Sequence, residues 1–517
     1  MRLEYQLEPH WPVQAWLAEC RGDRVLVRHG RRVETRDRWF CEVVWDGPFA
    51  DGDFDLTDVV AGSGARLRGL SLRFVTAGNT VDRLQSLDLP SGRGAAARTL
   101  VSNSLACLLA VSGARVNPRY RFYRRDLQSV VRGLGKFKST LDTSLGPCRL
   151  WYFDNVDWDG GALRPVQKPE PKHDFSAFEG YYDFLHGTMG RVARNAADPA
   201  RDHPLGLIGT MSSGYDSTTV STLARDHGLR EVITFGEART HEDDSGTVAA
   251  RHLGLHAILV RRDAWRQHHL PEVPFLAAEG GGEDRFFLEA EEHLRGKLLL
   301  TGYHGDKVWS KSPYGPDSLD PHPAIKRGDR SGLSLTEYRL LAGFVHCPVP
   351  FWGARRIHEL VAISRHPHMK PWDVPGDYSR PICRRIVEGA GVPREAFGRT
   401  KLAASVLDYV LSDSSRPDYA AWCARHGIEG ELFDRVVRRA IRSLPRAASG
   451  RVRFMFYGPR VPTFRDFYFH WAIERLGDRY RIPAANGNVE RRARFTPPGD
   501  GLRSVPSRNA AVALAGV

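Results

Sequence analysis

The chain has 517 residues and a mass of 58.0 kDa, which is too large for one ordinary hydrophobic core and predicts two or three domains. The content of 42% hydrophobic and 26% charged residues excludes a mainly disordered chain. No apolar run approaches the ~18 residues of a membrane span and no secretory signal stands at the start, so we expect a cytoplasmic protein that is not embedded in a membrane. The formal net charge is +13, yet the basic residues are spread along the chain without a block of like charges, so charge alone does not select a nucleic-acid partner.

Residues 1–160 are predicted to form a β-rich domain. β-prone runs on both sides of His29-Gly30 indicate a hairpin with its turn at these two residues. The run 67–78 alternates between apolar and polar residues, as half-buried strands do. The apolar stretch 102–113 is compatible with either a strand or a helix.

The pattern changes at 161–174, where prolines without apolar periodicity predict a linker or exposed loop. Residues 175–486 follow as an α/β region, in which apolar strand-like runs alternate with helical stretches and predict a parallel sheet with right-handed crossovers. The strands are expected at 205–211, 231–237, 256–262 and 297–305. The part from 330 to 485 is predicted to be mainly helical, and the tail 487–517 to be poorly ordered.

The loop after the first of these strands carries small polar residues and one acid. Ser212, Ser213 and Gly214 would offer backbone amides at the N-terminus of the following helix, which suits a phosphate group. Asp216 would repel a phosphate unless a divalent cation lay between them, and Mg²⁺ prefers one or two carboxylates together with phosphate oxygens. No GK[ST] follows, so this is not a Walker loop. An ordinary strand-to-helix turn would also account for the segment.

The segment SSGYDS (212–217) resembles the SGGxDS pyrophosphate loop of the PP-loop ATP pyrophosphatases, specifically the synthetase domain of asparagine synthetases and β-lactam synthetases. Members of this family bind ATP and Mg²⁺, adenylate a carboxylate and release pyrophosphate. One glycine of the motif is a serine here, which adds a Cβ where the phosphates approach. The resemblance implies that the following residues contact the nucleotide: Ser212, Ser213, Gly214, Tyr215, Asp216, Ser217, Phe235 and Gly236.

Three later segments are similar to further motifs of the same family, in the same order. In LLLTGYHGDKVW (298–309), the resemblance places Gly302 at the nucleotide and makes Asp306 the second Mg²⁺ ligand. HCPVPFWGARRIHELVA (346–362) resembles the ExRxPFLD segment. VPREAFGRTK (392–401) resembles LPxxxxxRxK, which implies that Arg399 binds the nucleotide and that Lys401 neutralises charge on the leaving group or on the acyl-adenylate.

Tyr303 falls where β-lactam synthetases carry a catalytic tyrosine. The usual glutamate partner of that tyrosine is replaced by His346 in this chain. Since imidazole titrates near neutral pH, a Tyr303–His346 pair could take a proton from an attacking amine. A tyrosine packed at a strand end and a histidine satisfied in a loop would explain the same residues without catalysis.

Three acids that follow the second predicted strand are further candidates to line the cleft: Glu237, Asp243 and Asp244. At the amino terminus, asparagine synthetases carry a glutaminase whose cysteine is exposed once Met1 is removed. Here Arg2 occupies that position and the nearest cysteine is Cys20, so glutamine would not supply ammonia by this route. Residues 1–160 would then be a degenerate glutaminase-like domain or an unrelated β domain.

The resemblance therefore implies an ATP- and Mg²⁺-dependent, AMP-forming ligase that joins a small-molecule carboxylate to an amine or ammonia in a biosynthetic pathway. An arginine-rich cleft would suit a negatively charged acid. Two alternatives remain open at this point. A PP-loop enzyme acting on RNA would explain the basic charge, although the later motifs match the amide-forming branch and make nucleic acid an unlikely partner. A non-catalytic relative would explain Ser213 and His346, but not the retention of Asp216, Asp306 and Lys401.

Overall fold

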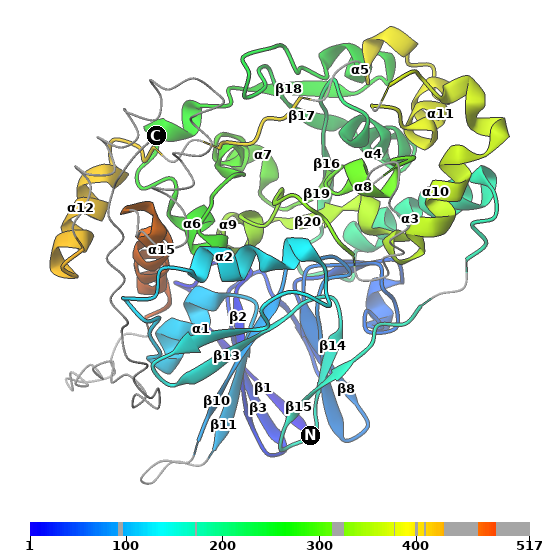
Figure 1. Ribbon diagram of the computed structural model, residues 1–517. Coiled ribbons are helices and arrows are strands. Elements are labelled where there is room, and N and C mark those ends of the chain that lie inside the picture. Colours follow the sequence, from blue (N-terminus) through cyan, green and yellow to red (C-terminus); the bar gives the residue numbers. More distant parts are fainter. Residues whose placement is uncertain are drawn as a thin grey trace, which may run out of the picture.

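The computed structural model describes residues 1–90, 97–170, 173–312, 325–376, 378–398, 402–407, 410–428 and 464–481. Within them, a β-rich region extends to residue 166, and an α/β region with a helical C-terminal part follows from residue 178 (Figure 1). No described helix is both long enough and apolar enough to cross a membrane. The predicted tail, 487–517, lies outside the described residues.

The β-rich region consists of two sheets that face one another, with a small two-stranded sheet beside them (Figure 1). The seven-stranded sheet has the order β1 (Arg2–Leu7), β3 (Arg24–His29), β2 (Trp16–Arg21), β11 (Arg98–Ser102), β10 (Leu84–Leu89), β13 (Gly146–Trp151) and β12 (Thr140–Thr143). The six-stranded sheet has the order β15 (Leu163–Val166), β14 (Asn155–Trp158), β9 (Ser71–Val75), β8 (Gly64–Arg68), β5 (Trp39–Cys41) and β4 (Glu34–Arg36). The small sheet pairs β6 (Val44–Trp45) with β7 (Val60–Ala61). Side chains from both large sheets, such as Trp16 and Phe74, share one apolar core.

The hairpin predicted at His29-Gly30 is wrong. Strand β3 pairs with β2 through a tight turn at Gly22, and β4 pairs with β5 in the other sheet. After His29 the chain leaves the first sheet, and Gly30 runs so close to residue 12 that a Cβ would lie 2.2 Å from the Pro12 carbonyl oxygen. This close backbone approach carries the chain from one sheet to the other instead of reversing it.

The structure decides the conformation of two other segments of this region, one that the sequence left open and one that it predicted to be a linker. The ambiguous stretch 102–113 contains helix α1 (Leu105–Ser112), which Ser104 caps by accepting a hydrogen bond from the amide of Cys107. The predicted linker contains β15, whose Pro165 is tolerated because the strand lies at the edge of its sheet. Lys168, in the same segment, is buried and donates a hydrogen bond of 2.7 Å to Asn155.

The α/β region is built on a five-stranded parallel sheet with the order β18 (His256–Val260), β17 (Glu231–Phe235), β16 (Gly206–Thr210), β19 (Lys297–Thr301) and β20 (Val345–Pro348). The four predicted strands are confirmed. Strand β20 was not predicted, because its short run lies among prolines. Leu298 and Leu300 point into one apolar core and Leu299 into the other, so both faces of the sheet are covered.

The helices of the described residues are α1, α2 (Tyr123–Leu127), α3 (Phe178–Ala196), α4 (Asp216–Arg225), α5 (Thr247–His252), α6 (Val273–Glu279), α7 (Glu291–Leu294), α8 (Gly305–Val308), α9 (Leu335–Ala342), α10 (Ile357–Arg365), α11 (Pro381–Gly389), α12 (Ser415–Arg425) and α15 (Tyr468–Gly477). Along the chain, β16 leads outward to β17 and β18, and the sheet then continues with β19 on the opposite side of β16. The direction of winding thus reverses between β16 and β19, and such a switch point is where open α/β sheets bind ligands.

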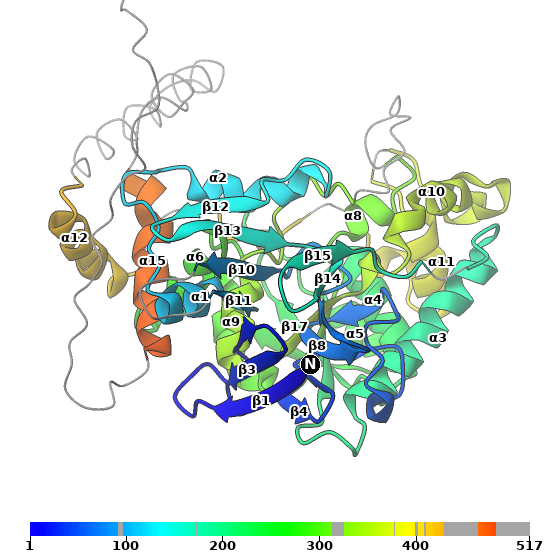
Figure 2. The same ribbon diagram turned by 90° about the horizontal axis from the view of Figure 1, so that it is seen from below.

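The two regions share buried contacts. Helix α15 packs beside α1 of the β-rich region and α6 of the α/β region (Figures 1 and 2). Arg339 on α9 is 1% exposed and donates to Glu42 at 2.7 Å and to Asp82 at 3.0 Å, both from the β-rich region. The guanidinium and the two carboxylates therefore compensate one another inside the junction.

Replacing Arg339 by Met should lower the free energy of unfolding by about 3–5 kcal/mol, because the change leaves two buried carboxylates without their cation. Chemical denaturation monitored by fluorescence measures this change. Arg164→Met is the matched control, since the Arg164–Asp159 pair is largely exposed and should contribute less than about 1 kcal/mol. A change below about 1 kcal/mol for the Arg339 variant would contradict the role given to this cluster.

Candidate functional site

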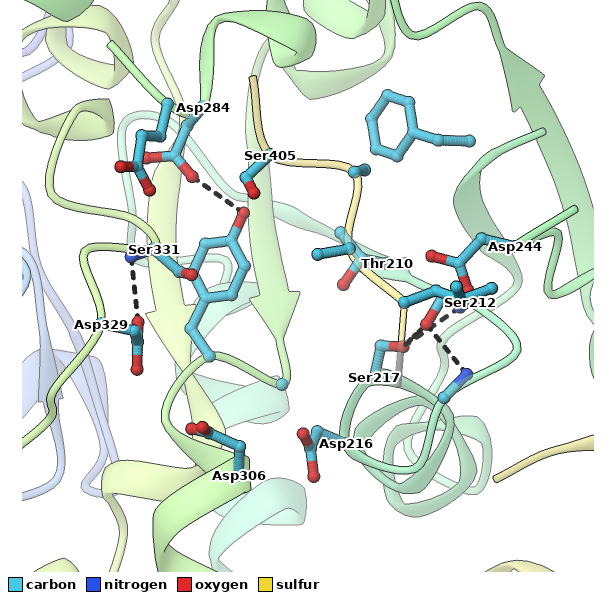
Figure 3. A pocket seen from close by; sticks show the side chains of 18 of the residues that line it. Thr210, Ser212, Asp216, Ser217, Asp244, Asp284, Asp306, Asp329, Ser331 and Ser405 are labelled. Atoms are coloured by element: carbon cyan, nitrogen blue, oxygen red, sulfur yellow. Dashed lines mark hydrogen bonds between the residues drawn. The ribbon is translucent and has the colours of Figure 1, made fainter. Parts of the chain in front are cut away.

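A cavity of about 510 Å³ opens at the carboxyl ends of β16 and β19. Its walls come from the loop between β16 and α4, the turn between β19 and α8, the segments around 284 and 329, and residues 402–407. These parts are distant in sequence and meet at the switch point of the sheet. Figure 3 shows the polar side chains that face this space.

The loop after β16 lies where the sequence predicts a phosphate site. Five of its predicted residues line the cavity: Ser212, Gly214, Tyr215, Asp216 and Ser217. Helix α4 begins at Asp216, so the amides of its first turn have no acceptor within the helix and the positive end of its dipole faces the loop.

Hydroxyl groups hold this loop in shape. The Ser212 hydroxyl accepts from the Gly214 amide at 3.1 Å and lies 3.0 Å from the Ser217 hydroxyl. Ser213 does not line the cavity. Its hydroxyl donates to Asp244 at 2.7 Å and so anchors the loop to the segment after β17.

The two predicted Mg²⁺ ligands are brought together. Asp216, after β16, and Asp306, after β19, lie near one another at one end of the cavity, and both line it (Figure 3). Arg380 is 5% exposed and its Nε lies 3.3 Å from Asp216 Oδ1. Two carboxylates that line one cavity are oxygen ligands of the kind that Mg²⁺ prefers.

Gly302 and Gly305 permit this approach. A Cβ on Gly302 would lie 2.4 Å from the backbone of Asp216 and Ser217, and a Cβ on Gly305 would lie 2.7 Å from Asp216 Cγ. Gly302, predicted to contact the nucleotide, lines the cavity and also lets the turn after β19 touch the loop after β16. Any larger residue at either position would push Asp216 away from Asp306.

Tyr303 lines the cavity, and its hydroxyl donates to Asp284 at 3.1 Å. Asp284 is 1% exposed and also accepts from the Gly332 amide and the Ser334 hydroxyl, at 2.9 and 2.6 Å. The carboxylate therefore fixes both the tyrosine and the segment 332–334. The hydrogen-bond partner of the Tyr303 hydroxyl is thus Asp284 and not His346.

His346 lies beside Tyr303, with ring centroids 5.6 Å apart, but it is fully buried and does not line the cavity. Its Nε2 is 2.8 Å from the Thr301 hydroxyl. Burial, together with the charge of Arg339, lowers the pKa of His346 to about 3, so the imidazole is neutral at physiological pH and a weak base. The predicted Tyr303–His346 pair is thus a ring contact, and the hydrogen bond of Tyr303 goes elsewhere.

The carboxyl groups of Asp284 and Glu283, on the same side of the cavity as Tyr303, have raised pKa values. Burial, reinforced by Glu279, raises the pKa of Asp284 to about 6. Burial, reinforced by Glu279 and Asp284, raises the pKa of Glu283 to about 7 against the opposing charge of Arg330. Burial also raises the pKa of Tyr303 well above its ordinary value, so the phenol keeps its proton.

His304 adopts an unusual backbone conformation at this site. Its φ is +77°, in the left-handed region that side chains other than glycine rarely enter, and the residue is 3% exposed. Its ring stacks on Phe351 with centroids 4.6 Å apart. A left-handed non-glycine residue costs about 1–3 kcal/mol, and such outliers cluster at functional sites.

The side of the cavity predicted to hold adenine is apolar. Phe235 lines it and packs edge-on against Phe286, whereas Gly236 is not among the lining residues. Of the three acids after β17, Asp244 lines the cavity, while Glu237 and Asp243 pair in an exposed bridge outside it.

Residues 402–407 cross this side of the cavity as an extended strap. The Ala403 carbonyl accepts from the Arg239 amide at 2.9 Å, Arg262 donates to the Ala404 carbonyl at 2.7 Å, and the Val406 amide donates to the Glu283 carbonyl at 2.9 Å. The predicted site residues Arg399 and Lys401 immediately precede this strap and lie outside the described residues, so their roles remain predictions.

Several lining residues were not predicted: Arg239, Glu283, Asp284, Asp329, Arg330 and Arg380. None belongs to a motif at a strand end. The only sequence signal is weak: the acids at 283–284 follow three consecutive glycines, and Arg380 opens a helix with Pro381 at its first turn. No family model matches the chain, and no curated protein is significantly similar to it.

Proposed function

We propose that the protein is an ATP-dependent, AMP-forming ligase that adenylates a carboxylate and then forms an amide bond with an amine. The observation that carries the proposal is the convergence of Asp216 and Asp306, which follow adjacent parallel strands, on one cavity that Tyr303 also lines. The five-stranded sheet, with its helical C-terminal part, is compatible with the PP-loop synthetase domain that the motifs resemble. The β-rich region would then correspond to a glutaminase-like domain without its cysteine.

In this proposal Asp216 and Asp306 would hold Mg²⁺, and the ion would supply positive charge that offsets the charge of the polyphosphate. The amides at the start of α4 face the phosphates, and Arg380, held beside Asp216, adds a buried positive charge at the same end. Adenine would lie against Phe235 under the strap 402–407, which Lys401 immediately precedes in the sequence. Each of these groups acts by position and charge, which is what phosphoryl transfer mainly requires.

Tyr303 and Asp284 would act on the amine. Because the phenol keeps its proton, Tyr303 cannot serve as a preformed phenolate base. Its hydroxyl instead passes its own proton to Asp284 while its oxygen takes one from the attacking nitrogen. Asp284 is ionised at neutral pH and can accept that proton.

Product analysis tests the proposal. Purified protein with ATP, Mg²⁺ and pooled acids and amines should release AMP and pyrophosphate, with acid-dependent exchange of labelled pyrophosphate into ATP. Release of ADP and phosphate would contradict an adenylating ligase. Failure of Mg²⁺–ATP to bind, measured by calorimetry on the same sample, would favour a non-catalytic relative instead.

The rate of amide formation should rise with pH between about 6 and 7. Asp284 accepts a proton only as the carboxylate, so protonation below its raised pKa of about 6 removes the acceptor, and Glu283 with a pKa of about 7 titrates beside it. Because the two carboxyl groups interact, the acid limb of the pH–rate profile reports apparent pKa values of the pair and not of either residue alone. Pyrophosphate exchange, which needs no proton acceptor at the amine, is the internal control and should lack this limb. Amide formation at a constant rate from pH 5.5 to 7.5 would rule out the relay.

A further inference from the structure

The cavity has the opposite charge to the rest of the chain. Six carboxylates line it (Asp216, Asp244, Glu283, Asp284, Asp306 and Asp329) together with three guanidinium groups (Arg239, Arg330 and Arg380), a formal charge of −3 in a protein of net charge +13. The lining is therefore not the arginine-rich cleft that would suit a negatively charged acid. A cavity of this charge attracts cations and repels a substrate with extra acidic groups.

The acids divide between two ends of the cavity. Asp216 and Asp306 face the proposed Mg²⁺, beside the loop that carries Ser212 and Ser217 (Figure 3). Asp284 and Asp329 lie across the cavity from that loop (Figure 3). Glu283 joins them in the lining and forms an ion pair with Arg330. Asp329 is in turn ion-paired at 3.2 Å with the buried Arg327, so the far compartment, defined here as Glu283, Asp284, Asp329 and Arg330, has a formal charge of −1 once Arg327 is counted.

Apart from Glu283 Oε1, which is ion-paired with Arg330, two buried atoms of the residues that line this end of the cavity have no hydrogen-bond partner in the described part of the chain. They are Nδ1 of His304, whose residue is 3% exposed and held in the left-handed conformation, and Oδ2 of Asp329. Asp329 Oδ1 is already used, because it accepts from Arg327 at 3.2 Å and from the Ser331 amide at 3.0 Å. Since a carboxylate oxygen only accepts and an imidazole nitrogen can accept, the pair lacks a donor rather than an acceptor.

A ligand that completes this compartment must carry a positive charge and several donors. An alkylammonium group has three donors and no acceptor, whereas a carboxylate or phosphate would meet acids and unfilled acceptors. We infer that the far compartment binds the amine substrate as a cationic ammonium, held by Glu283, Asp329 and Nδ1 of His304. The inference rests on the proposed ligase function and specifies its nucleophile: a substrate amine that arrives charged.

The chemistry balances with these groups. The ammonium first gives one proton to the Glu283 carboxylate, which leaves a neutral amine with a free electron pair. That pair attacks the acyl carbon of the adenylate, so the C–N bond forms and the C–O bond to the phosphate of AMP breaks, with AMP taking the electrons. The second nitrogen proton moves through the Tyr303 hydroxyl to Asp284.

Ligand-detected NMR on the full chain, loaded with Mg²⁺ and α,β-methylene-ATP, tests the inference with n-butylammonium as the probe. Its neutral counterpart is 1-butanol, and ammonium chloride tests whether the bare ion suffices. We expect n-butylammonium to bind at least ten times more tightly than either of the other two. Glu283→Gln should weaken n-butylammonium at least tenfold and leave the nucleotide analogue within twofold. Glu289→Gln, an acid of the same segment outside the cavity, is the matched control and should change neither.

Equal binding of butanol and butylammonium, equal competition by ammonium chloride, or unchanged binding in the Glu283 variant would each overturn the inference. If Glu283→Gln lowers the melting temperature by more than a few degrees, Asp329→Asn provides the second variant with the same expected loss. Nucleotide binding is measured in the same samples. Loss of nucleotide binding alone would therefore count against the ligase proposal, and loss of amine binding alone against the cationic substrate.

Discussion

Replacing Asp216 by Asn should reduce Mg²⁺-dependent conversion of ATP to AMP and pyrophosphate by at least ~1,000-fold. The substitution keeps the size of the side chain but removes one of the two charges proposed to hold the metal, and a group that stabilises developing charge in a dry site is worth about 3–4 kcal/mol or more. Asp306→Asn should have a similar effect, because the two carboxylates face the same space. Initial rates of pyrophosphate release across a Mg²⁺ titration measure the loss.

Asp226→Asn is the matched control for this experiment. Asp226 lies at the other end of α4 with about half of its side chain exposed, so the same chemical change there should leave turnover intact. Circular dichroism spectra of both variants check that the fold persists, which matters because Asp216 also faces the buried Arg380. Turnover near the wild-type rate in the Asp216 variant would remove this residue from the mechanism.

The second large effect is expected from Tyr303→Phe, which should slow amide formation by about 100- to 10,000-fold while adenylation stays within a few-fold of wild type. The substitution removes only the hydroxyl that links the attacking nitrogen to Asp284, and positioned proton transfer contributes about this much. Pyrophosphate exchange reports adenylation, and product formation from the amine reports the second step. The ratio of the two rates is the informative quantity.

Tyr338→Phe controls for loss of a buried tyrosine hydroxyl. Tyr338 packs in the apolar core on one face of the sheet, and its hydroxyl donates to the Phe287 carbonyl at 3.3 Å, away from the cavity. It should leave both half-reactions unchanged. Equal losses of both half-reactions in the Tyr303 variant would place this residue at the nucleotide instead. Unchanged amide formation would mean that the proton leaves by another route.

The fold was predictable where one physical signal dominates. The apolar runs that became β16, β17, β18 and β19 are short and bounded by glycine or polar residues, and β17 and β19 are largely buried, so the apolar pattern identifies them. Strand β20 is equally buried but lies in HCPVP, where proline conceals the strand pattern. The hairpin at His29-Gly30 failed for another reason: strand propensity and turn residues were both present, but tertiary contact with residue 12 decided where the chain went.

The residues of the candidate site also fall into those that the sequence could predict and those that it could not. Asp216 and Asp306 could be predicted as a pair because parallel strands deliver their carboxyl ends to one edge of a sheet. Asp284 and Asp329 could not, since each lies in an irregular segment whose position depends on side chains far away in the sequence. Asp284, for example, is fixed by bonds to Tyr303, Gly332 and Ser334, and no local pattern encodes these bonds.

The ion cluster at the junction of the two regions also restricts how this protein can be rebuilt. Arg339 belongs to one region, and its two acids, Glu42 and Asp82, belong to the other. A chimaera that exchanged the β-rich half for that of another protein would have to carry both acids with it, or bury a lone cation at the seam. Neither half can therefore be exchanged without regard to the buried charges of the other.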